Sequence, residues 1–221
     1  GLGDVYKRQV NTDEKVKLRL SGVDITNSDG PAIYFKNTDK GYITLTDGTD
    51  NTLTDSEQYN YEDASAPLFS DDNLEIKGNG SLIINANYKH GIAGDDDIRI
   101  ENGNITINSK IGDGIHAKCG VKIIGGTLNI TSDGDGIQSG EWNVIVDGGE
   151  INMTTTGEII GSHKNITGFP NDFERNEPQD DGAKFDSNTL PENYRNNVNE
   201  KGGISPVSYT HLRAHETSLH L

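Results

Sequence analysis

The chain has 221 residues, a formal net charge of −16, 27 glycines and one cysteine, and 31% of its residues are hydrophobic. Leu, Ile, Val and Phe together account for 50 residues, of which 23 are Ile. Fifty of 221 residues is a share only just above the roughly 20% of Leu, Ile, Val and Phe below which a highly charged chain is expected to be disordered. The composition therefore excludes a wide globular core, but it allows a narrow column of repeated apolar positions.

The same figures exclude several classes of protein. Binding to a phosphate backbone needs clustered Lys and Arg, so we expect no nucleic-acid partner, and cations or neutral ligands fit the charge better. A lone Cys119 excludes an internal disulfide framework. No apolar run reaches the roughly 18 residues of a membrane span, so we expect none in this fragment.

The two ends of the chain differ from the rest. Residues 1–9 (GLGDVYKRQ) and residues 207–221 (VSYTHLRAHETSLHL) resemble translated sequencing-adapter read-through of the kind that contaminates metagenomic assemblies. Foreign segments are set aside before the fold is considered. We therefore expect both native termini, and any export signal, to lie outside this sequence.

From residue 15 to residue 70 the apolar pattern is loose but already repetitive. KVKLRL, GVDIT and GPAIYF predict three short strands and hence one coil of a repeating structure. GYITL, NTL and APLF predict the next coil, and a loop at residues 56–63 separates its last two strands.

Further along, the pattern repeats about every 23 residues. Each repeat holds two short period-2 strands separated by a glycine-bearing turn, and then a third strand with one apolar residue. A fixed period of this length indicates a solenoid. The three registers are Leu74/Ile76, Ile98/Ile100, Val121/Ile123 and Val144/Val146; Leu82/Ile84, Ile105/Ile107, Leu128/Ile130 and Ile151/Met153; and Ile92, Ile115, Ile137 and Ile160.

The repeat predicts an all-β fold, a right-handed single-stranded parallel β-helix with about six coils in residues 10–162. Coils stacked at roughly 4.8 Å explain both the thin core and the excess of Ile. Residues 163–203 are polar and without period, which predicts a loop or insertion. Residues 204–206 predict the start of a further coil, truncated at the C-terminal side.

Two long runs carry a family resemblance. SGVDITNSDGPAIYFKNTDKGYITLTDGTDNTLTDS and APLFSDDNLEIKGNGSLIINANYKHGIAGDDDIRIENGNITINSKIGDGIHAK resemble the bacterial carbohydrate-binding domain family, formerly a domain of unknown function. The resemblance covers roughly residues 15–162, whereas residues 163–203 follow no pattern of the family. It implies a pectate-lyase-like fold, export to the cell surface or medium, calcium binding, and affinity for cellulose and acidic polysaccharides. We expect the protein to be monomeric.

Acidic residues recur at equivalent positions of successive coils. Carboxylates about 5 Å apart repel by about 3 kcal/mol at an effective dielectric near 20. A stacked column therefore needs a counter-cation, a raised pKa or side chains turned into water. Ca²⁺ suits it because calcium accepts six to eight oxygen ligands, although Asp before Gly is also an ordinary turn residue. The predicted calcium ligands are Asp95, Asp96, Asp113, Asp135 and Glu158.

Zinc is disfavoured, because one Cys and three scattered native His give no tetrahedral set of ligands. Aromatic rings in turns are candidate sugar contacts, since a ring face stacks on a pyranose face. The predicted carbohydrate-binding residues are Trp142, Tyr88 and the neighbouring Glu141, and each of the two rings could instead cover its own turn.

Arg99 and Lys122 are the basic residues at outward positions of the ladder, and a lyase needs such a base beside a charge sink. A cross-coil pair between Arg99 and Glu75 is the simpler interpretation. We therefore expect a non-catalytic extracellular protein, stabilised by calcium, that binds plant cell-wall polysaccharide such as cellulose or acidic pectin. The alternatives are a calcium-dependent lyase acting on uronic-acid polymers and a structural surface stalk or adhesin.

Overall fold

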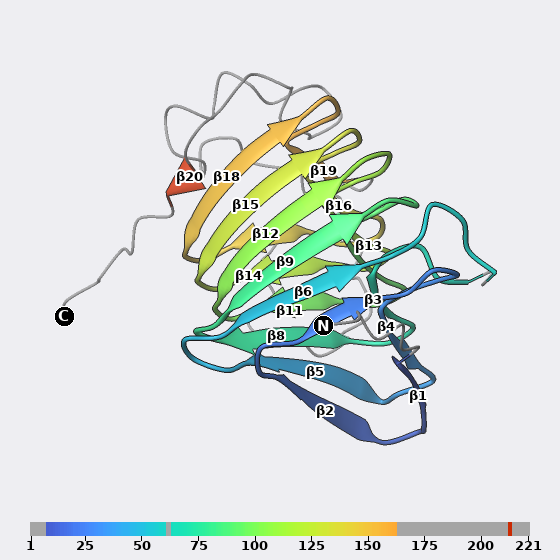
Figure 1. Cartoon of the computed structure of the whole chain (residues 1–221). Helices are drawn as coiled ribbons and strands as arrows, with labels where there is room; N and C mark the ends of the chain where they lie inside the picture. The colour runs from blue at the N-terminus through green and yellow to red at the C-terminus, as the bar shows by residue number, and fades with distance from the viewer. Residues whose placement is uncertain (1–7, 61–62, 163–211, 214–221) are drawn as a thin grey trace.

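Every regular element in the described part of the protein is a β-strand. The computed structural model describes residues 8–60, 63–162 and 212–213. Strands form because each repeat alternates aliphatic and polar residues, the pattern of a strand with one buried face. The chain runs through three sheets in turn, so three strands make one coil of a solenoid (Figure 1).

The sheets are numbered I to III. Sheet I holds β1 (Arg8–Asn11), β4 (Ile33–Lys36), β7 (Leu68–Ser70), β10 (Ile92–Gly94), β13 (Ile115–Ala117), β16 (Ile137–Ser139) and β19 (Ile160–Ser162). Sheet II holds β2 (Lys15–Leu20), β5 (Lys40–Leu45), β8 (Leu74–Gly78), β11 (Ile98–Ile100), β14 (Val121–Ile123) and β17 (Val144–Val146). Sheet III holds β3 (Asp24–Thr26), β6 (Asp50–Thr54), β9 (Ser81–Ala86), β12 (Asn104–Ser109), β15 (Thr127–Ser132), β18 (Glu150–Thr155) and β20 (Leu212–Arg213).

From β1 to β19 each strand pairs in parallel with the equivalent strand of the next coil. On sheet I, Ile92 lies beside Ile115, which lies beside Ile137. On sheet III, Ile84 lies beside Ile107. These are the partners that the repeat predicts, so the prediction of a parallel β-helix of about six coils is confirmed.

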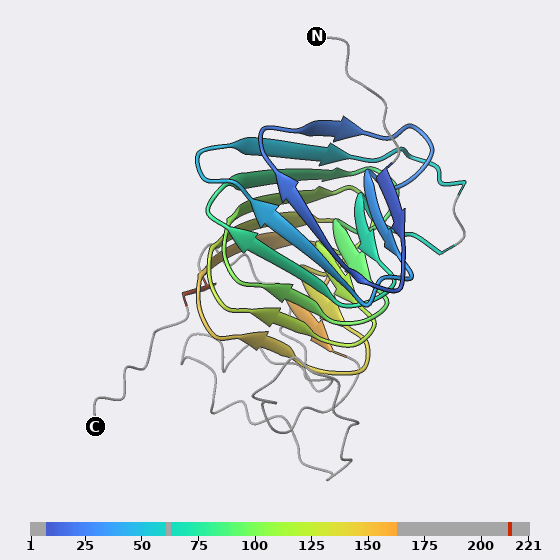
Figure 2. The same ribbon diagram turned by 90° about the horizontal axis from the view of Figure 1, so that it is seen from below.

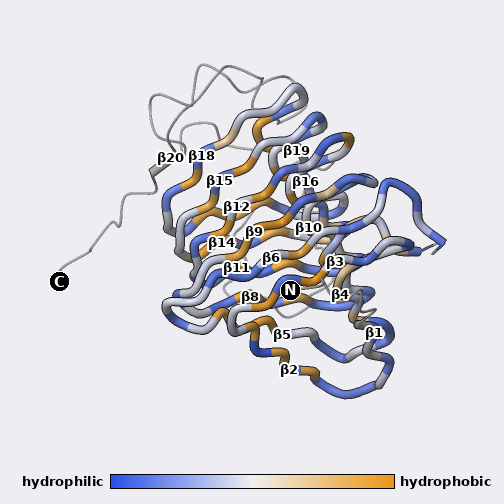
Figure 3. Tube along the Cα trace, viewed as in Figure 1, coloured by the Kyte–Doolittle hydropathy of each residue, from blue (hydrophilic) through white to orange (hydrophobic). Residues whose placement is uncertain are grey.

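The core is a column of aliphatic side chains inside the coils. Ile84, Ile107 and Ile130 stack in one row, and none of them is more than 2% exposed. Hydrophobic and hydrophilic positions alternate along the strands of sheet III (Figure 3). The backbone also approaches the core closely, since a Cβ at Gly114 would lie 2.3 Å from Cγ2 of Ile130. A core this narrow is how a chain with few apolar residues folds.

The loop between β6 and β7 covers part of the outer face of sheet I. Ala64 and Ala66 of this insertion (residues 55–67) pack with Tyr34, Phe69 and Ala93 in a second, smaller apolar cluster. The insertion extends from the side of the solenoid (Figure 2). It therefore creates a wall on a sheet that would otherwise be flat.

The ends carry two further strands. β1 begins at Arg8, inside the segment predicted to be adapter-derived, and pairs with β4. β20, inside the second such segment, lies antiparallel to β18. The loop predicted at residues 163–203 and the coil start predicted at 204–206 lie outside the described residues.

Candidate functional site

A pocket of about 240 Å³ opens on the outer face of sheet I, at the edge of the insertion. The side chains that point outward from this sheet follow one another in the order Phe69, Ala93 and His116. The methyl group of Ala93 leaves a hollow between the two larger rings. The remaining polar and aromatic lining comes from Asp63, Ser65, Tyr88, Lys89, His90, Asp95 and Lys118.

Tyr88 is held in place by the insertion. Its ring stacks on Tyr59 with centroids 4.1 Å apart and 15° between the planes. The Tyr59 hydroxyl donates to Oδ2 of Asp55 at 2.7 Å, and Oδ1 of Asp55 accepts the backbone N–H of Asn87 at 2.6 Å. Asp55 thus ties the insertion to the turn that carries Tyr88, so one face of the Tyr88 ring is covered by protein.

Two histidines and an aspartate meet at the pocket. The rings of His90 and His116 stack with centroids 4.1 Å apart and 22° between the planes. Nδ1 of His116 lies 2.7 Å from Oδ2 of Asp113, and Nδ1 of His90 lies 3.2 Å from the same oxygen. The backbone N–H of Asp113 also donates to His90 Nδ1 at 3.0 Å.

The protonation of this group follows from burial. Desolvation acts to raise the pKa of the buried Asp113, but its contacts with His116 and His90 outweigh this and hold the pKa well below its usual range. Burial lowers the pKa of His90. The group therefore contains an ionised Asp113 and, at neutral pH, a neutral His90.

The predicted column of acids before the sheet I strands is present and is hydrogen-bonded to the backbone. Oδ1 of Asp113 accepts the N–H of Asp135 at 2.8 Å, and Oδ1 of Asp135 accepts the N–H of Glu158 at 2.7 Å. Each carboxylate thus binds an amide of the next coil. These amide dipoles offset part of the repulsion that the stacking creates.

The other two predicted metal ligands, Asp95 and Asp96, come after a sheet I strand and lie in the turn between β10 and β11. Asp95 Oδ2 forms an ion pair with Lys118 Nζ at 2.7 Å. Ligand atoms of Asp96, Asp97 and Cys119 lie within 4.8 Å of one another. The five predicted ligands therefore form two separate groups, one before and one after the strands of sheet I.

The turn that carries Asp96 and Asp97, called the acidic turn below, suits a hard cation such as calcium. The group of His90, His116 and Asp113 suits zinc poorly. Oδ1 of Asn73, beside Asp96, is buried and has no hydrogen-bond partner among the described residues. Carboxylate and amide oxygens suit calcium. Burial and the neighbouring Asp96 raise the pKa of the Cys119 thiol to about 12, so the thiol stays protonated. In the histidine group the rings are nearly parallel, so their in-plane lone pairs do not converge on one ion.

Trp142 and Glu141 stand one coil beyond the pocket and are not part of its lining. The backbone N–H of Glu141 donates to the Lys118 carbonyl at 2.7 Å. The backbone carbonyl of Trp142 accepts the hydroxyl of Ser139. Of the three predicted carbohydrate-binding residues, the structure places Tyr88 alone in the pocket.

The two predicted basic candidates lie on sheet II, away from the pocket. Arg99 contacts Glu101 at 3.2 Å, and Lys122 contacts Asp147 at 3.0 Å. Glu75, the partner expected for Arg99, forms ion pairs with Lys40 and Lys77 instead. Register places Glu75 beside Arg99 as expected, but the long side chains pair with residues two positions further along the same strand or diagonally across to the next one.

Sequence reasoning missed His116, Lys89 and Lys118 as pocket residues. In the sequence His116 is one of three scattered native histidines, although it stands 26 residues after His90, close to the repeat length. That spacing is the signal that brings the two rings onto adjacent coils. Within the described residues no helix is long and apolar enough to span a membrane.

The fold defines a class of protein, the single-stranded parallel β-helices. The structure is similar to that of a polysaccharide lyase-like protein from C. thermocellum, a gadolinium derivative, with a TM-score of 0.62 and 27% identity over 74% of this chain and 88% of that one. A carbohydrate-binding domain-containing protein of Acetivibrio thermocellus is 46% identical over 88 residues, which are 38% of this chain and 31% of that relative. The match spans about a third of the relative's length.

The profile of the carbohydrate-binding domain-containing protein family matches residues 5–174. The chain belongs to this family. The resemblance seen in the sequence is therefore confirmed.

Proposed function

We propose that the protein binds plant cell-wall polysaccharide, cellulose or acidic pectin-type chains, in the pocket on sheet I, without cleaving it. The observation that carries the proposal is the pocket itself, in which a buttressed aromatic ring and several charged side chains converge in a chain of the carbohydrate-binding family. Concave sites with a few convergent polar groups are the usual form of a small-ligand site.

The chemistry of the lining supports a sugar ligand. Tyr88, backed by Tyr59, offers a ring held in one orientation, which lowers the entropy lost on binding. His116, Lys89 and Lys118 supply donors, and Asp63 and Asp95 supply acceptors for hydroxyl groups. A pocket with both kinds of group suits hydroxylated sugars, with or without a carboxylate.

The pocket proposal is tested by isothermal titration with cello-oligosaccharides and oligogalacturonides. We expect Tyr88→Ala and His116→Ala each to weaken binding of the bound oligosaccharide about tenfold or more, because each removes a contact on one wall. The matched control is Lys110→Ala, which removes an exposed side chain that does not line the pocket. Unchanged affinity in both pocket variants would contradict the assignment.

One observation favours a lyase as the second candidate. His116 Nδ1 lies at hydrogen-bond distance from the ionised Asp113, and a proton on Nδ1 would leave Nε2 able to accept a proton in the pocket. In that case His116, rather than Arg99 or Lys122, would take the proton beside a uronate carboxylate. Growth of unsaturated-product absorbance with polygalacturonate, lost in His116→Ala, would establish this activity and refute the non-catalytic proposal.

We also propose that calcium stabilises the coils at the acidic turn, through Asp96, Asp97 and the amide oxygen of Asn73. The buried Asn73 oxygen supports this, and the similar C. thermocellum protein was solved as a derivative of gadolinium, another cation that prefers oxygen ligands. Bound there, calcium would supply positive charge between the neighbouring carboxylates of Asp96 and Asp97. A protein that binds plant cell-wall polysaccharide would meet its ligand outside the cell, so we also propose an extracellular or cell-surface location.

Calcium binding has a direct thermal test. We expect added Ca²⁺ to raise the midpoint of unfolding of chelator-treated protein by several degrees, as a ligand specific for the folded state does. Asp96→Asn should reduce that shift, whereas Asp147→Asn, on another turn, should leave it intact. No shift on calcium addition would count against the site.

A further inference from the structure

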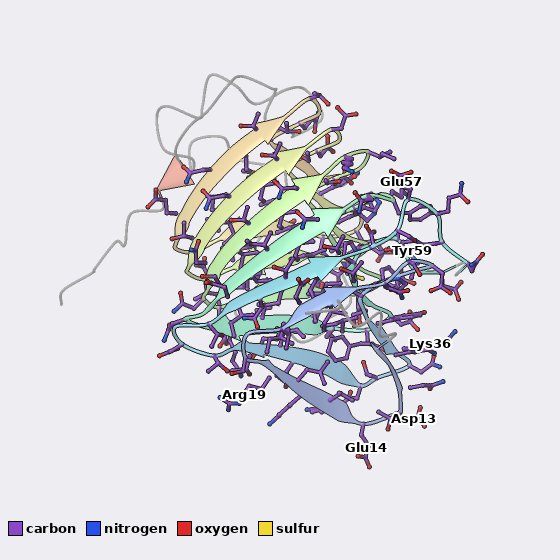
Figure 4. All side chains as sticks on the ribbon, in the orientation of Figure 1. Asp13, Glu14, Arg19, Lys36, Glu57 and Tyr59 are labelled. Carbon is purple, nitrogen blue, oxygen red and sulfur yellow. The ribbon has the colours of Figure 1, made fainter. Side chains whose placement is uncertain are left out.

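The chain has a negative net charge, but one face of the solenoid is basic. Outward side chains of β2, β5 and β8 form one end of the outer surface of sheet II, and the exposed Arg19 is on β2 (Figure 4). The outward side chains of these strands include five cations and one carboxylate, that of Glu75, on a chain whose formal net charge is −16. A second carboxylate, that of Asp39 in the turn before β5, lies 3.8 Å from Lys15 Nζ. The cations are Lys15, Lys17, Arg19, Lys40 and Lys77.

An aromatic ring stands at the centre of this face. The Nζ atoms of Lys17, Lys40 and Lys77 lie 5.5, 4.9 and 5.2 Å from the centroid of the Tyr42 ring. Three ammonium groups within 6 Å of one ring are each attracted by its quadrupole, yet they repel one another. We call Tyr42, Lys17, Lys40 and Lys77 the Tyr42 cluster.

A buried carboxylate fixes two of the three lysines. Glu75 is 6% exposed, and its two oxygens lie 2.8 Å from Lys40 Nζ and 3.0 Å from Lys77 Nζ. These two lysines lower the pKa of Glu75 despite its burial, and Glu75 raises the pKa of Lys77. One negative charge is therefore shared by two ammonium groups, each of which has three N–H donors. The cluster keeps an excess of positive charge and of donors.

Protection of an open sheet edge explains only part of this pattern. β2 is the terminal strand of sheet II, and lysines on such strands oppose edge-to-edge aggregation. That reason covers Lys15 and Lys17. It does not explain a tyrosine on β5 or a buried glutamate on β8 that holds lysines from two strands around the ring.

We infer that the Tyr42 cluster is a second binding surface, on which a carboxylate-bearing polysaccharide lies along sheet II. The ring would contact a sugar face, and the ammonium groups would bind the carboxylates. The inference rests on the proposed carbohydrate-binding function but uses a different face from the pocket. The coil spacing, roughly 4.8 Å, is close to the length that one pyranose adds to an extended chain.

A nucleic acid fits this face less well. Phosphate-backbone binding draws on roughly 6 to 10 phosphate contacts, whereas this end of sheet II carries five cationic side chains, and two of them are paired with Glu75. A uronate chain needs fewer charges, because part of its affinity comes from the ring contact.

The inference is tested with polygalacturonate by affinity electrophoresis and by titration at low and physiological salt. We expect Lys17→Glu and Tyr42→Ala each to weaken binding about tenfold. Lys17→Glu should leave the unfolding midpoint unchanged, because Lys17 is exposed. Wild-type affinity should fall with added salt. Lys110→Glu, with the same charge reversal elsewhere, should bind like the wild type.

The result separates the two surfaces. Loss in the Tyr42 and Lys17 variants, with binding retained in Tyr88→Ala, supports the cluster even if the pocket proposal fails. Wild-type binding by Lys17→Glu, or equal loss in Lys110→Glu, would overturn the inference. Equally tight binding of single-stranded DNA would also overturn it, because the surface would then select charge alone.

Discussion

Replacing Ile107 by Ala is expected to lower the free energy of unfolding by about 2 to 5 kcal/mol. The Ile107 side chain is fully buried in the row between Ile84 and Ile130. A Cβ on Gly91 would lie 2.2 Å from its Cγ2, so the surrounding backbone is already close-packed. Truncation of Ile107 leaves a cavity. A core that is one side chain wide has few neighbouring side chains that can move to fill it. Urea denaturation followed by circular dichroism measures the loss.

Ile83→Ala is the matched control, because Ile83 precedes the stacked Ile84 on β9 but points outward and is 38% exposed. We expect its effect to stay within about 0.5 kcal/mol, as for surface substitutions. If both variants unfolded at the same urea concentration, the inward and outward assignment of sheet III would be wrong.

Replacing Asp113 by Ala is expected to cost about 3 kcal/mol, the effect of breaking a buried charged network. The substitution removes the acceptor for the Asp135 N–H and the partner of His116 Nδ1. It would leave the half-buried Asp135 amide without this acceptor and the stacked imidazoles without their common anchor. The thermal midpoint and the NMR signals of the two imidazoles report the change.

Asp113→Asn separates hydrogen bonding from charge. Its side-chain oxygen can still accept the Asp135 amide, so we expect a smaller loss than for Asp113→Ala. Asp133→Ala, which removes an exposed carboxylate from a neighbouring turn, should cost little. A stability loss in Asp133→Ala equal to that in Asp113→Ala would mean that the ladder of carboxylates adds nothing beyond ordinary turn chemistry.

The fold was predictable because a β-helix is built from local repeats. Apolar residues at the same place in each repeat must stack. The repeat therefore predicts directly that Ile105 pairs with Leu128. Glycines in the turns and alternation within strands gave the three sheets. The insertion between β6 and β7 was also visible, since it interrupts the period with polar residues.

The candidate site was predictable only in part. The sequence indicates Tyr88 as a candidate sugar contact, and the structure places it in the pocket. The sequence also shows that the Asp113 column is acidic. Its hydrogen bonds to the next coil were not foreseen, because a sequence shows spacing and not which atoms a carboxylate faces. The pairing of Glu75 with two lysines was missed for the same reason.

The amino-acid sequence alone determined the solenoid, its register and its thin isoleucine core, because those properties depend on one period. The tertiary structure decided where the insertion closes on sheet I, and therefore that Tyr88, His116 and Lys118 share a pocket. It also decided that lysines collect around Tyr42 on a chain of strongly negative net charge. Net charge is a sum over residues, whereas binding depends on which residues face the same side, and stacking of the coils fixes that.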